Sequence, residues 1–126
     1  NNDIKKYAAR VLGSVARNDT NRSLIGSTPL AFSSLVRLLG SESDAIKQCA
    51  ARALGILAYN NDTNRGLIGS TLRAISLLVK LLEDGNERIK EYATCVLANL
   101  AFNDTNRGLI GSEPGVFTLL VKLLED

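Results

Sequence analysis

A ten-residue phrase that occurs three times constrains the fold of this chain more than any other feature. The phrase Asn-Asp-Thr-Asn-Arg-x-Leu-Ile-Gly-Ser begins at positions 18, 61 and 103. A second phrase, Leu-Val-Lys/Arg-Leu-Leu, begins at positions 35, 78 and 120. Successive copies of both phrases are separated by 43 and then 42 residues, so the 126 residues hold three phased copies of one unit. Self-similarity at such a period indicates a repeat architecture.

Apolar spacing within the unit predicts a long amphipathic helix. In the third copy the apolar positions are Ile89, Tyr92, Ala93, Val96, Leu97 and Leu100. This is the i, i+3, i+4, i+7 spacing of a helix that buries one face. The copies that begin at Ile4 and Ile46 have apolar or small residues at most of the same positions, and Cys49 occupies one of them. No segment alternates with period two, so we expect no β-strands.

The repeated ten-residue phrase carries start and stop signals for two further helices. Its leading Asn and Asp suit a helix N-cap, because their side-chain oxygens accept hydrogen bonds from free backbone N–H groups. The Gly at positions 26, 69 and 111 is expected to end this short helix in a left-handed conformation. The Ser that follows, at positions 27, 70 and 112, is expected to cap the next helix. Each unit is therefore predicted to contain three helices.

This unit resembles the armadillo repeat. A period of 42 residues suits both armadillo and HEAT repeats, and three helices per unit favour armadillo. The stretch from Ile89 to Ala101 is similar to the third helix of armadillo repeats, and Asn99 falls on the recurring Asn of that helix. The resemblance implies an all-α, right-handed α-α superhelix. It predicts one armadillo-repeat domain over 1–126, composed of a third helix (3–17), two repeats (18–59 and 60–102) and a first and second helix (103–126).

The resemblance also implies a binding surface, because the third helices of armadillo proteins line a concave groove that holds extended peptides. The polar side of the three predicted third helices is expected to face this groove. The predicted groove residues are Lys6, Arg10, Ser14 and Arg17 in the first copy, Gln48, Arg52, Ile56 and Tyr59 in the second, and Glu91, Cys95, Asn99 and Phe102 in the third. The predicted role is a protein–protein interaction scaffold, with an extended peptide segment of another protein as its partner.

The residues of this groove predict an acidic or phosphorylated peptide. The family often grips peptides with a Trp and an Asn four residues later, whereas this chain has no Trp and keeps only Asn99. Arg10 and Arg52 stand at Trp positions, so a Lys/Arg-rich peptide is disfavoured. Lys6, Arg10, Arg17 and Arg52 instead form a basic strip, and guanidinium groups bind carboxylates and phosphates in bidentate fashion. The simpler interpretation, that these are solvated helix faces, stays open.

Composition argues against several other classes of function. The chain has no His, no Gly-x-x-x-x-Gly-Lys loop and no dinucleotide fingerprint, so we expect no enzyme and no cofactor. A net charge of +2 is low for nucleic acid binding, to which only the basic strip points. The acidic pairs Glu83-Asp84 and Glu125-Asp126 are expected to be solvated helix ends rather than a metal site.

Two further expectations concern compartment and assembly. Cys49 and Cys95 form no CxxC pair, which predicts reduced thiols and a cytoplasmic or nuclear protein. No apolar run approaches the roughly 18 residues of a membrane-spanning helix. Neither end carries an obvious polar cap, and solenoid units bury their faces only against neighbouring units. End-to-end self-association is therefore the alternative function.

Overall fold

The computed structural model describes residues 1–125, and over this range the chain is helical and contains no β-strand. The helices are α1 (Asn2–Val15), α2 (Asp19–Gly26), α3 (Ala31–Leu38), α4 (Asp44–Ala58), α5 (Asp62–Ser70), α6 (Ala74–Leu81), α7 (Glu87–Leu100), α8 (Asp104–Gly111) and α9 (Val116–Glu125). The all-α fold expected from the apolar periodicity is confirmed.

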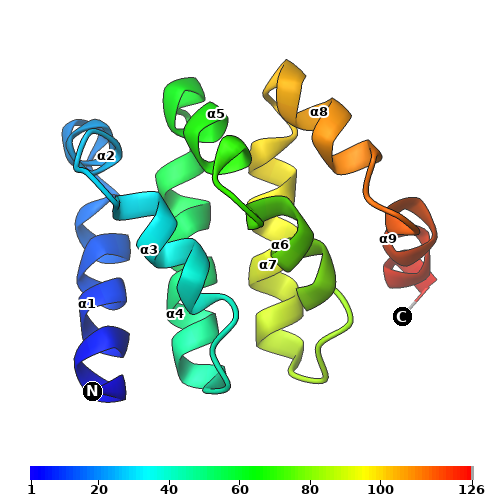
Figure 1. Cartoon of the computed structure of the whole chain (residues 1–126), viewed down its shortest axis with the longest axis horizontal. Helices are drawn as coiled ribbons and strands as arrows, with labels where there is room; N and C mark the ends of the chain where they lie inside the picture. Colours follow the sequence, from blue (N-terminus) through cyan, green and yellow to red (C-terminus); the bar gives the residue numbers. More distant parts are fainter. Residues whose placement is uncertain (126) are drawn as a thin grey trace.

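The helices are arranged in successive layers of three. The long helices α1, α4 and α7 stand side by side, while α2, α5 and α8 follow one another along one edge (Figure 1). α3 packs against α4, and α6 packs in the same way against α7. Each layer therefore contacts only its neighbours, which is the organisation of a solenoid with three helices per unit.

Burial is deepest in α4 because this helix has a neighbouring long helix on each side. Ile46, Leu54 and Leu57 are fully buried, and Ala50 and Ala53 between them are small enough to let α1 and α7 approach closely. Burying one such Ile or Leu side chain stabilises the fold by about 1.5–3 kcal/mol. The predicted apolar stripe thus forms a core that runs continuously from layer to layer.

The expected N-caps of the short first helices are present. Asn18, Asn61 and Asn103 precede α2, α5 and α8, and each side-chain oxygen accepts from the backbone N–H three residues on, at 3.0, 2.9 and 3.1 Å. The repeated phrase therefore starts the same helix in all three copies. One such cap stabilises a helix by about 1 kcal/mol.

The prediction that a Ser caps each second helix is wrong. The hydroxyl groups donate instead to carbonyls of the first helix that precedes them, at 3.0 Å for Ser27, 3.2 Å for Ser70 and 2.8 Å for Ser112. α3 and α6 instead begin after Leu30 and Arg73, which are left-handed (φ 68° at both) and make no side-chain cap. In the third copy the equivalent residue is Gly115 (φ 74°), the residue type that this conformation favours. A left-handed turn therefore replaces the side-chain cap.

The repeated Gly does not end its helix in a left-handed conformation, contrary to expectation. Gly26 and Gly69 lie inside the last turn of α2 and α5 without a positive φ. A Cβ at Gly26 would lie 2.9 Å from Asn64 Cγ and would collide with Asn64 Oδ1. A Cβ at Gly69 would lie 2.5 Å from Asn106 Cγ and would collide with Asn106 Oδ1. Glycine is needed here because the side chain of the next unit occupies the space.

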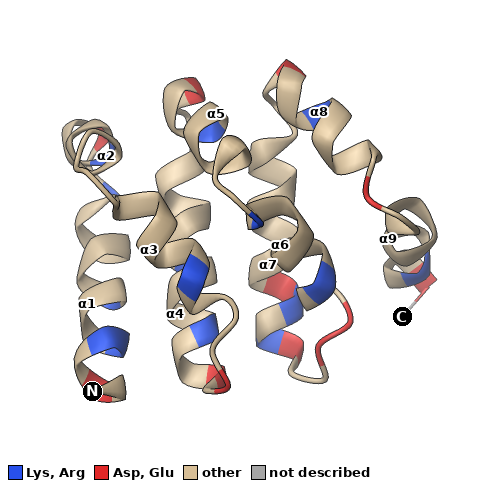
Figure 2. Ribbon diagram, in the orientation of Figure 1, with Lys and Arg blue, Asp and Glu red and all other residues tan. Residues whose placement is uncertain are grey.

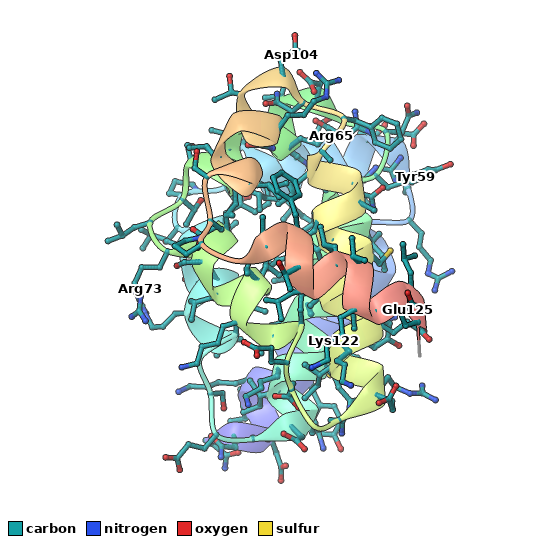
Figure 3. All side chains as sticks on the ribbon, turned by 90° about the vertical axis from the view of Figure 1, so that its right-hand side faces the viewer. Tyr59, Arg65, Arg73, Asp104, Lys122 and Glu125 are labelled. Carbon is teal, nitrogen blue, oxygen red and sulfur yellow. The ribbon has the colours of Figure 1, made fainter. Side chains whose placement is uncertain are left out.

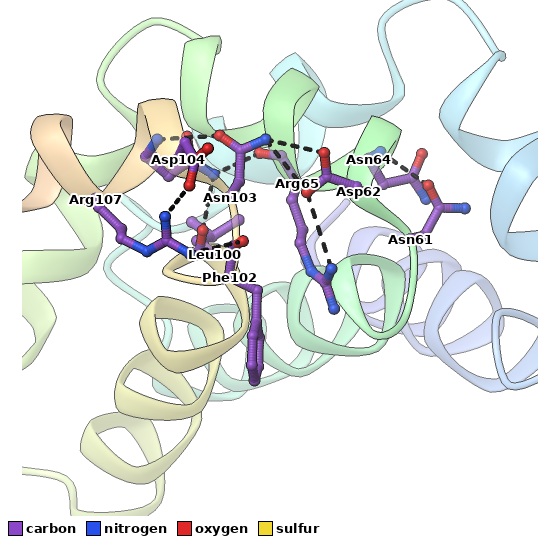
Figure 4. Close-up of polar contacts among 10 residues, drawn as sticks. Asn61, Asp62, Asn64, Arg65, Leu100, Phe102, Asn103, Asp104 and Arg107 are labelled. Atoms are coloured by element: carbon purple, nitrogen blue, oxygen red, sulfur yellow. Dashed lines mark hydrogen bonds and ion pairs between the residues drawn. The ribbon is translucent and has the colours of Figure 1, made fainter.

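These two contacts, Asn64 against Gly26 and Asn106 against Gly69, are called Asn–Gly junctions below. Both Asn side chains are 1% exposed. Each Nδ2 donates one bond to the preceding unit, Asn64 to the Arg22 carbonyl (3.0 Å) and Asn106 to the Arg65 carbonyl (2.8 Å). Each donates a second bond to the end of the preceding long helix, at the carbonyls of Leu57 (2.9 Å) and Leu100 (3.1 Å). The junctions therefore fix the register between successive layers. Arg65 and Leu100, whose carbonyls accept the two bonds of the second junction, are labelled in Figure 4.

A salt bridge adds a second polar contact between units. Lys47 Nζ lies 3.3 Å from Asp84 Oδ2, and the Asn86 backbone N–H donates to Asp84 Oδ1 at 2.9 Å. The Asn86 bond, helped by Lys47, lowers the pKa of the Asp84 carboxyl, although burial acts in the opposite direction. Asp84 is thus not the solvated helix end expected, and Asp126 of the other acidic pair lies outside the described residues.

Residues 1–125 lack two kinds of feature. No group of His, Cys, Asp and Glu side chains there is arranged to hold a metal ion. The helices of the same range are all too short or too polar to cross a bilayer.

Candidate peptide-binding groove

The predicted groove residues lie on α1, α4 and α7 and just beyond the ends of these helices, and none of them is buried. Six of them line one hollow of about 460 Å³: Arg17, Arg52, Ile56, Tyr59, Cys95 and Asn99. Viewed along the solenoid from its C-terminal end, Tyr59 lies on one side of the molecule and Arg73 of the outer turn on the opposite side (Figure 3). The structure therefore brings residues from three successive units to one surface.

Four further predicted residues line adjoining hollows. Arg10, Ser14 and Gln48 share with Arg52 a hollow of about 350 Å³ that is lined from α1, α4 and α7. Glu91 and Cys95 border a shallow hollow on α7. Arg52 and Cys95 each line two hollows, so the surface is continuous from α1 to α7.

Lys6 and Phe102 do not line these hollows. Lys6 is engaged locally, with its Nζ 3.8 Å from Asp3 and 4.7 Å from the centre of the Tyr7 ring. Phe102, just beyond α7, lies under the guanidinium of Arg65 at 5.0 Å. The basic strip expected from the sequence therefore reduces to three arginines in the groove.

The three groove arginines differ from most basic residues of the third helices and the repeated phrase in having no acidic partner. Within residues 1–125, Arg10, Arg17 and Arg52 have no carboxylate within 4.0 Å, whereas Arg22, Arg65 and Arg107 each pair with an Asp three residues earlier. Acidic residues gather instead at helix starts and in connecting loops (Figure 2). In the two hollows that these arginines line, the one acidic residue, Asp19, pairs with Arg22, so the charges of Arg10, Arg17 and Arg52 are not neutralised by ion pairs within the described chain.

Asn99 has a defined orientation in the groove. Its Nδ2 donates to the carbonyl oxygen of Gly55 on α4, at 3.1 Å, and lies 4.0 Å from Cys95 Sγ. The amide nitrogen is therefore held by the preceding unit. Within residues 1–125 the side-chain oxygen accepts no hydrogen bond, which leaves an acceptor on the groove surface.

Comparison with known proteins identifies the repeat. The armadillo/beta-catenin-like repeat model matches residues 69–102. Over its whole length the chain is similar to a designed armadillo repeat protein solved in complex with the peptide (KR)4, with 29% sequence identity and a TM-score of 0.88. The chain has the fold of an armadillo solenoid, and the repeat itself is matched over residues 69–102. It spans 52% of that designed protein, about half its length, and no curated protein matches it significantly.

Sequence reasoning missed one element of this armadillo surface, the Arg of the repeated phrase. Arg22 is 3% exposed, and its guanidinium lies 5.6 Å from the centre of the Tyr59 ring and donates to the Ala16 carbonyl at 2.7 Å. Arg65 takes the same place over Phe102. The signal was present in the sequence, because each Arg is followed, 37 residues later, by an aromatic residue at the end of the third helix.

Tyr92 also belongs to this surface. It was expected in the core stripe, but the structure places it half-buried, lining both hollows beside Arg52. Tyr59 and Tyr92 thus give the armadillo groove two aromatic walls near the arginines. The apolar stripe of the helix is wide, and Tyr92 lies at its border, where it faces the groove and not the neighbouring helix.

Proposed function

We propose that this segment binds an extended acidic or phosphorylated peptide of another protein in the groove of α1, α4 and α7. The observation that carries the proposal is the set of three groove arginines that lack an acidic partner. A carboxylate or phosphate entering there gains charge-assisted, bidentate hydrogen bonds without displacing an internal ion pair. A single residue with a solvated charge would not require a ligand, but three converge on adjoining hollows.

Apolar and backbone contacts support the same ligand class. Ile56, Tyr59 and Tyr92 supply an apolar surface beside the arginines, and aromatic and Arg side chains are enriched at binding hot spots. The side-chain oxygen of Asn99 is available to accept a peptide N–H. The ligand therefore has an extended backbone, with acidic side chains toward α1 and apolar side chains toward α7.

The proposed charge preference is opposite to that of the similar designed protein, which is solved with a basic peptide. In the present chain Arg10 and Arg52 would repel Lys and Arg side chains at short range. The proposed role is a non-catalytic scaffold, in keeping with the absence of His from the sequence. We place this role in the cytoplasm or nucleus, on the basis of two cysteines that remain thiols.

Fluorescence anisotropy with labelled peptides of equal length tests the proposal. A Glu-rich peptide with apolar residues interspersed, and its phosphoserine version, are expected to bind, and a Lys-rich peptide is not. Arg17→Ala is the first variant, because Arg17 is exposed and its removal leaves packing intact. We expect it to weaken binding about tenfold, or about 1.4 kcal/mol, because one bidentate ion pair is lost.

The matched control is Lys80→Ala, which removes one positive charge from α6, outside the groove. It should leave the affinity unchanged at moderate salt, because exposed charges farther apart than the Debye length are screened. Equal loss in both variants would show a non-specific charge effect. Failure of every acidic peptide, together with steeply salt-dependent binding of an oligonucleotide, would replace the proposal with nucleic acid binding.

A further inference from the structure

The hollow of about 460 Å³ in the groove, called the central hollow below, combines aromatic walls with positive charge. Tyr59, just beyond α4, and Tyr92, on α7, line it together with Ile56 of α4. Arg17 and Arg52 line the same hollow. Its volume lies within the range of about 300–1,000 Å³ that small-molecule sites occupy. The central hollow is therefore large enough to take one bulky side chain of a bound peptide.

The ring of Tyr59 is held against the edge of the solenoid. The buried guanidinium of Arg22 lies 5.6 Å from the centre of this ring and is itself fixed by its bond to the Ala16 carbonyl, at 2.7 Å. Arg65 and Phe102, both labelled in Figure 4, repeat the arrangement one unit later, with 5.0 Å between the guanidinium and the ring centre. Because a cation is attracted to the face of an aromatic ring, Tyr59 forms a wall of the central hollow before any ligand binds.

Arg52 also has a defined position, against the surface of α1. A Cβ at Gly13 would lie 3.2 Å from Arg52 Nη1, which is tighter than an ordinary contact, so the guanidinium lies where α1 carries no side chain. Arg52 is half-buried and forms no ion pair within residues 1–125. Arg17, in the turn after α1, adds a second guanidinium to the central hollow. An anion entering there meets two guanidinium groups that no carboxylate of the described chain occupies.

Phosphotyrosine matches the aromatic walls and the positive charge at once. Its ring packs favourably against other aromatic side chains, offset-stacked or edge to face. Its phosphate stands beyond the ring, where guanidinium groups bind it in bidentate fashion. Phosphoserine and Glu carry their charge close to the peptide backbone and have no ring, so they would leave Tyr59 and Tyr92 uncovered. The central hollow therefore distinguishes between ligands that the charge of the groove alone does not.

We propose that the central hollow is a phosphotyrosine subsite. The proposal rests on the peptide-binding function proposed above and names the side chain that this part of the groove takes. The ring of the phosphotyrosine packs against Tyr59 and Tyr92, and its phosphate binds Arg17 and Arg52. The side-chain oxygen of Asn99, at the same hollow, accepts a backbone N–H of the same peptide.

Fluorescence anisotropy with three labelled peptides tests the proposal. The peptides share one acidic sequence and differ only at a central residue, which is phosphotyrosine, phosphoserine or unmodified tyrosine. The phosphotyrosine peptide should bind about tenfold more tightly than either of the others, because it alone supplies both the ring and the phosphate. Phenyl phosphate should displace this peptide at lower concentration than inorganic phosphate does, for the same reason.

Substitutions of Tyr92 separate the ring from the charge. Tyr92→Leu keeps an apolar side chain and removes one aromatic wall, so most of the tenfold preference for phosphotyrosine over phosphoserine should be lost. Tyr92→Phe restores the ring and should restore the preference. The matched control is Tyr7→Leu, since Tyr7 occupies the equivalent position of the first unit, is exposed and does not line the central hollow. It should leave the preference unchanged.

The outcomes separate this subsite from the function on which it rests. Equal affinity for the phosphotyrosine and phosphoserine peptides would overturn the subsite and leave the proposed binding of acidic peptides intact. Failure of all three peptides to bind would overturn both. A preference that survives Tyr92→Leu would also overturn the subsite, because the ring would then bind elsewhere. Displacement of the phosphotyrosine peptide by an equal concentration of an oligonucleotide would overturn it in favour of a nucleic acid base and its phosphate.

Discussion

The edge formed by α2, α5 and α8 and the groove formed by α1, α4 and α7 are built from the same repeated unit, yet they use repetition in opposite ways. Along the edge nine of ten phrase residues are identical in all three copies. In the groove, equivalent positions differ: Ser14, Ile56 and Asn99 correspond to one another, as do Arg10, Arg52 and Cys95. The identical residues thus include those that cap a helix and those that meet the next unit, whereas the differing residues lie in the groove.

The contacts explain this contrast. At the edge, the second Asn of each phrase fits against the Gly of the preceding phrase, so a change in one copy would require a change in its neighbour. In the groove, Arg17 and Tyr59 are exposed and their neighbours impose no such match. The chain thus keeps its register with one surface, while the residues of the other surface vary between units.

The largest effect is expected from Gly69→Ala, which breaks an edge contact in the middle of the solenoid. The new Cβ collides with the amide of Asn106, which is buried and held by two hydrogen bonds. Forcing this side chain out should lower the free energy of unfolding by about 3 kcal/mol or more, combining overpacking with lost buried hydrogen bonds. Urea denaturation followed by circular dichroism measures the change.

Gly66→Ala is the control for this substitution, since it lies one turn earlier in the same helix. Its Cβ would lie 3.7 Å from Asn103, an ordinary contact. Replacing a helical Gly by Ala should then stabilise by about 0.5–1 kcal/mol. Equal effects of the two substitutions would mean that the Asn–Gly junction does not fix the register.

The next largest effect is expected from removing an Asn of the edge, and it should depend on position. Asn64→Ala loses two buried hydrogen bonds and should destabilise by about 2 kcal/mol, whereas Asn21→Ala loses one bond and should destabilise by about 1 kcal/mol or less. Both are measured by urea denaturation followed by circular dichroism. A terminal Asn as costly to remove as an interior one would contradict the role assigned to the preceding unit.

The sequence predicted the features that depend on neighbouring residues, namely the helices and their N-caps. The apolar period gave the long helices, and the leading Asn of the phrase gave the N-caps of α2, α5 and α8. The role of Gly26 was not predictable from neighbouring residues, because the side chain that requires it comes from Asn64 in the next unit. Ser27 has the right residue type for a cap, but its hydroxyl bonds back to its own helix instead. The α3 turn is made by left-handed Leu30, a conformation that its sequence does not suggest.

The residues of the candidate site were likewise predicted only in part. The family resemblance indicated which faces line a groove, and ten of the twelve named residues border adjoining hollows. Arg22 was missed because its sequence position belongs to a capping phrase, whereas its guanidinium reaches Tyr59 in the same layer. Lys6 was included because of its charge, but it is engaged by Asp3 and Tyr7. Side-chain reach, rather than helix register, decided both cases.

A substitution in the groove should reduce peptide affinity and leave stability almost unchanged, whereas the edge substitutions reduce stability. Tyr59→Ala removes an exposed ring whose main partner is Arg22, at 5.6 Å, and should change the free energy of unfolding by only about 0.5–1 kcal/mol. Affinity for the acidic peptide should fall at least severalfold, because the aromatic wall of the central hollow is lost. Anisotropy and denaturation on the same preparation separate the two effects. A variant that loses stability but keeps its affinity would place Tyr59 with the edge and not with the groove.

The smallest effect on stability is expected from Asp84→Asn, which removes the salt bridge to Lys47. The variant should lose about 1 kcal/mol or less at neutral pH, because the pair is single and partly exposed. The pKa of Asp84 is lowered in the folded chain, first by the Asn86 N–H and then by Lys47. Its contribution is therefore present above the unfolded pKa of about 3.9 and is lost as pH falls through the lower folded value.

Denaturation across acidic pH checks this sign. The stability difference between the unmodified chain and Asp84→Asn should be constant near neutral pH and should shrink only in acid. Glu83→Gln is the control, because Glu83 is the adjacent, exposed acid and makes no ion pair within residues 1–125. A difference that grows as pH falls would mean that burial, and not the Asn86 and Lys47 contacts, dominates at Asp84. The edge would then be the main polar determinant of register between units.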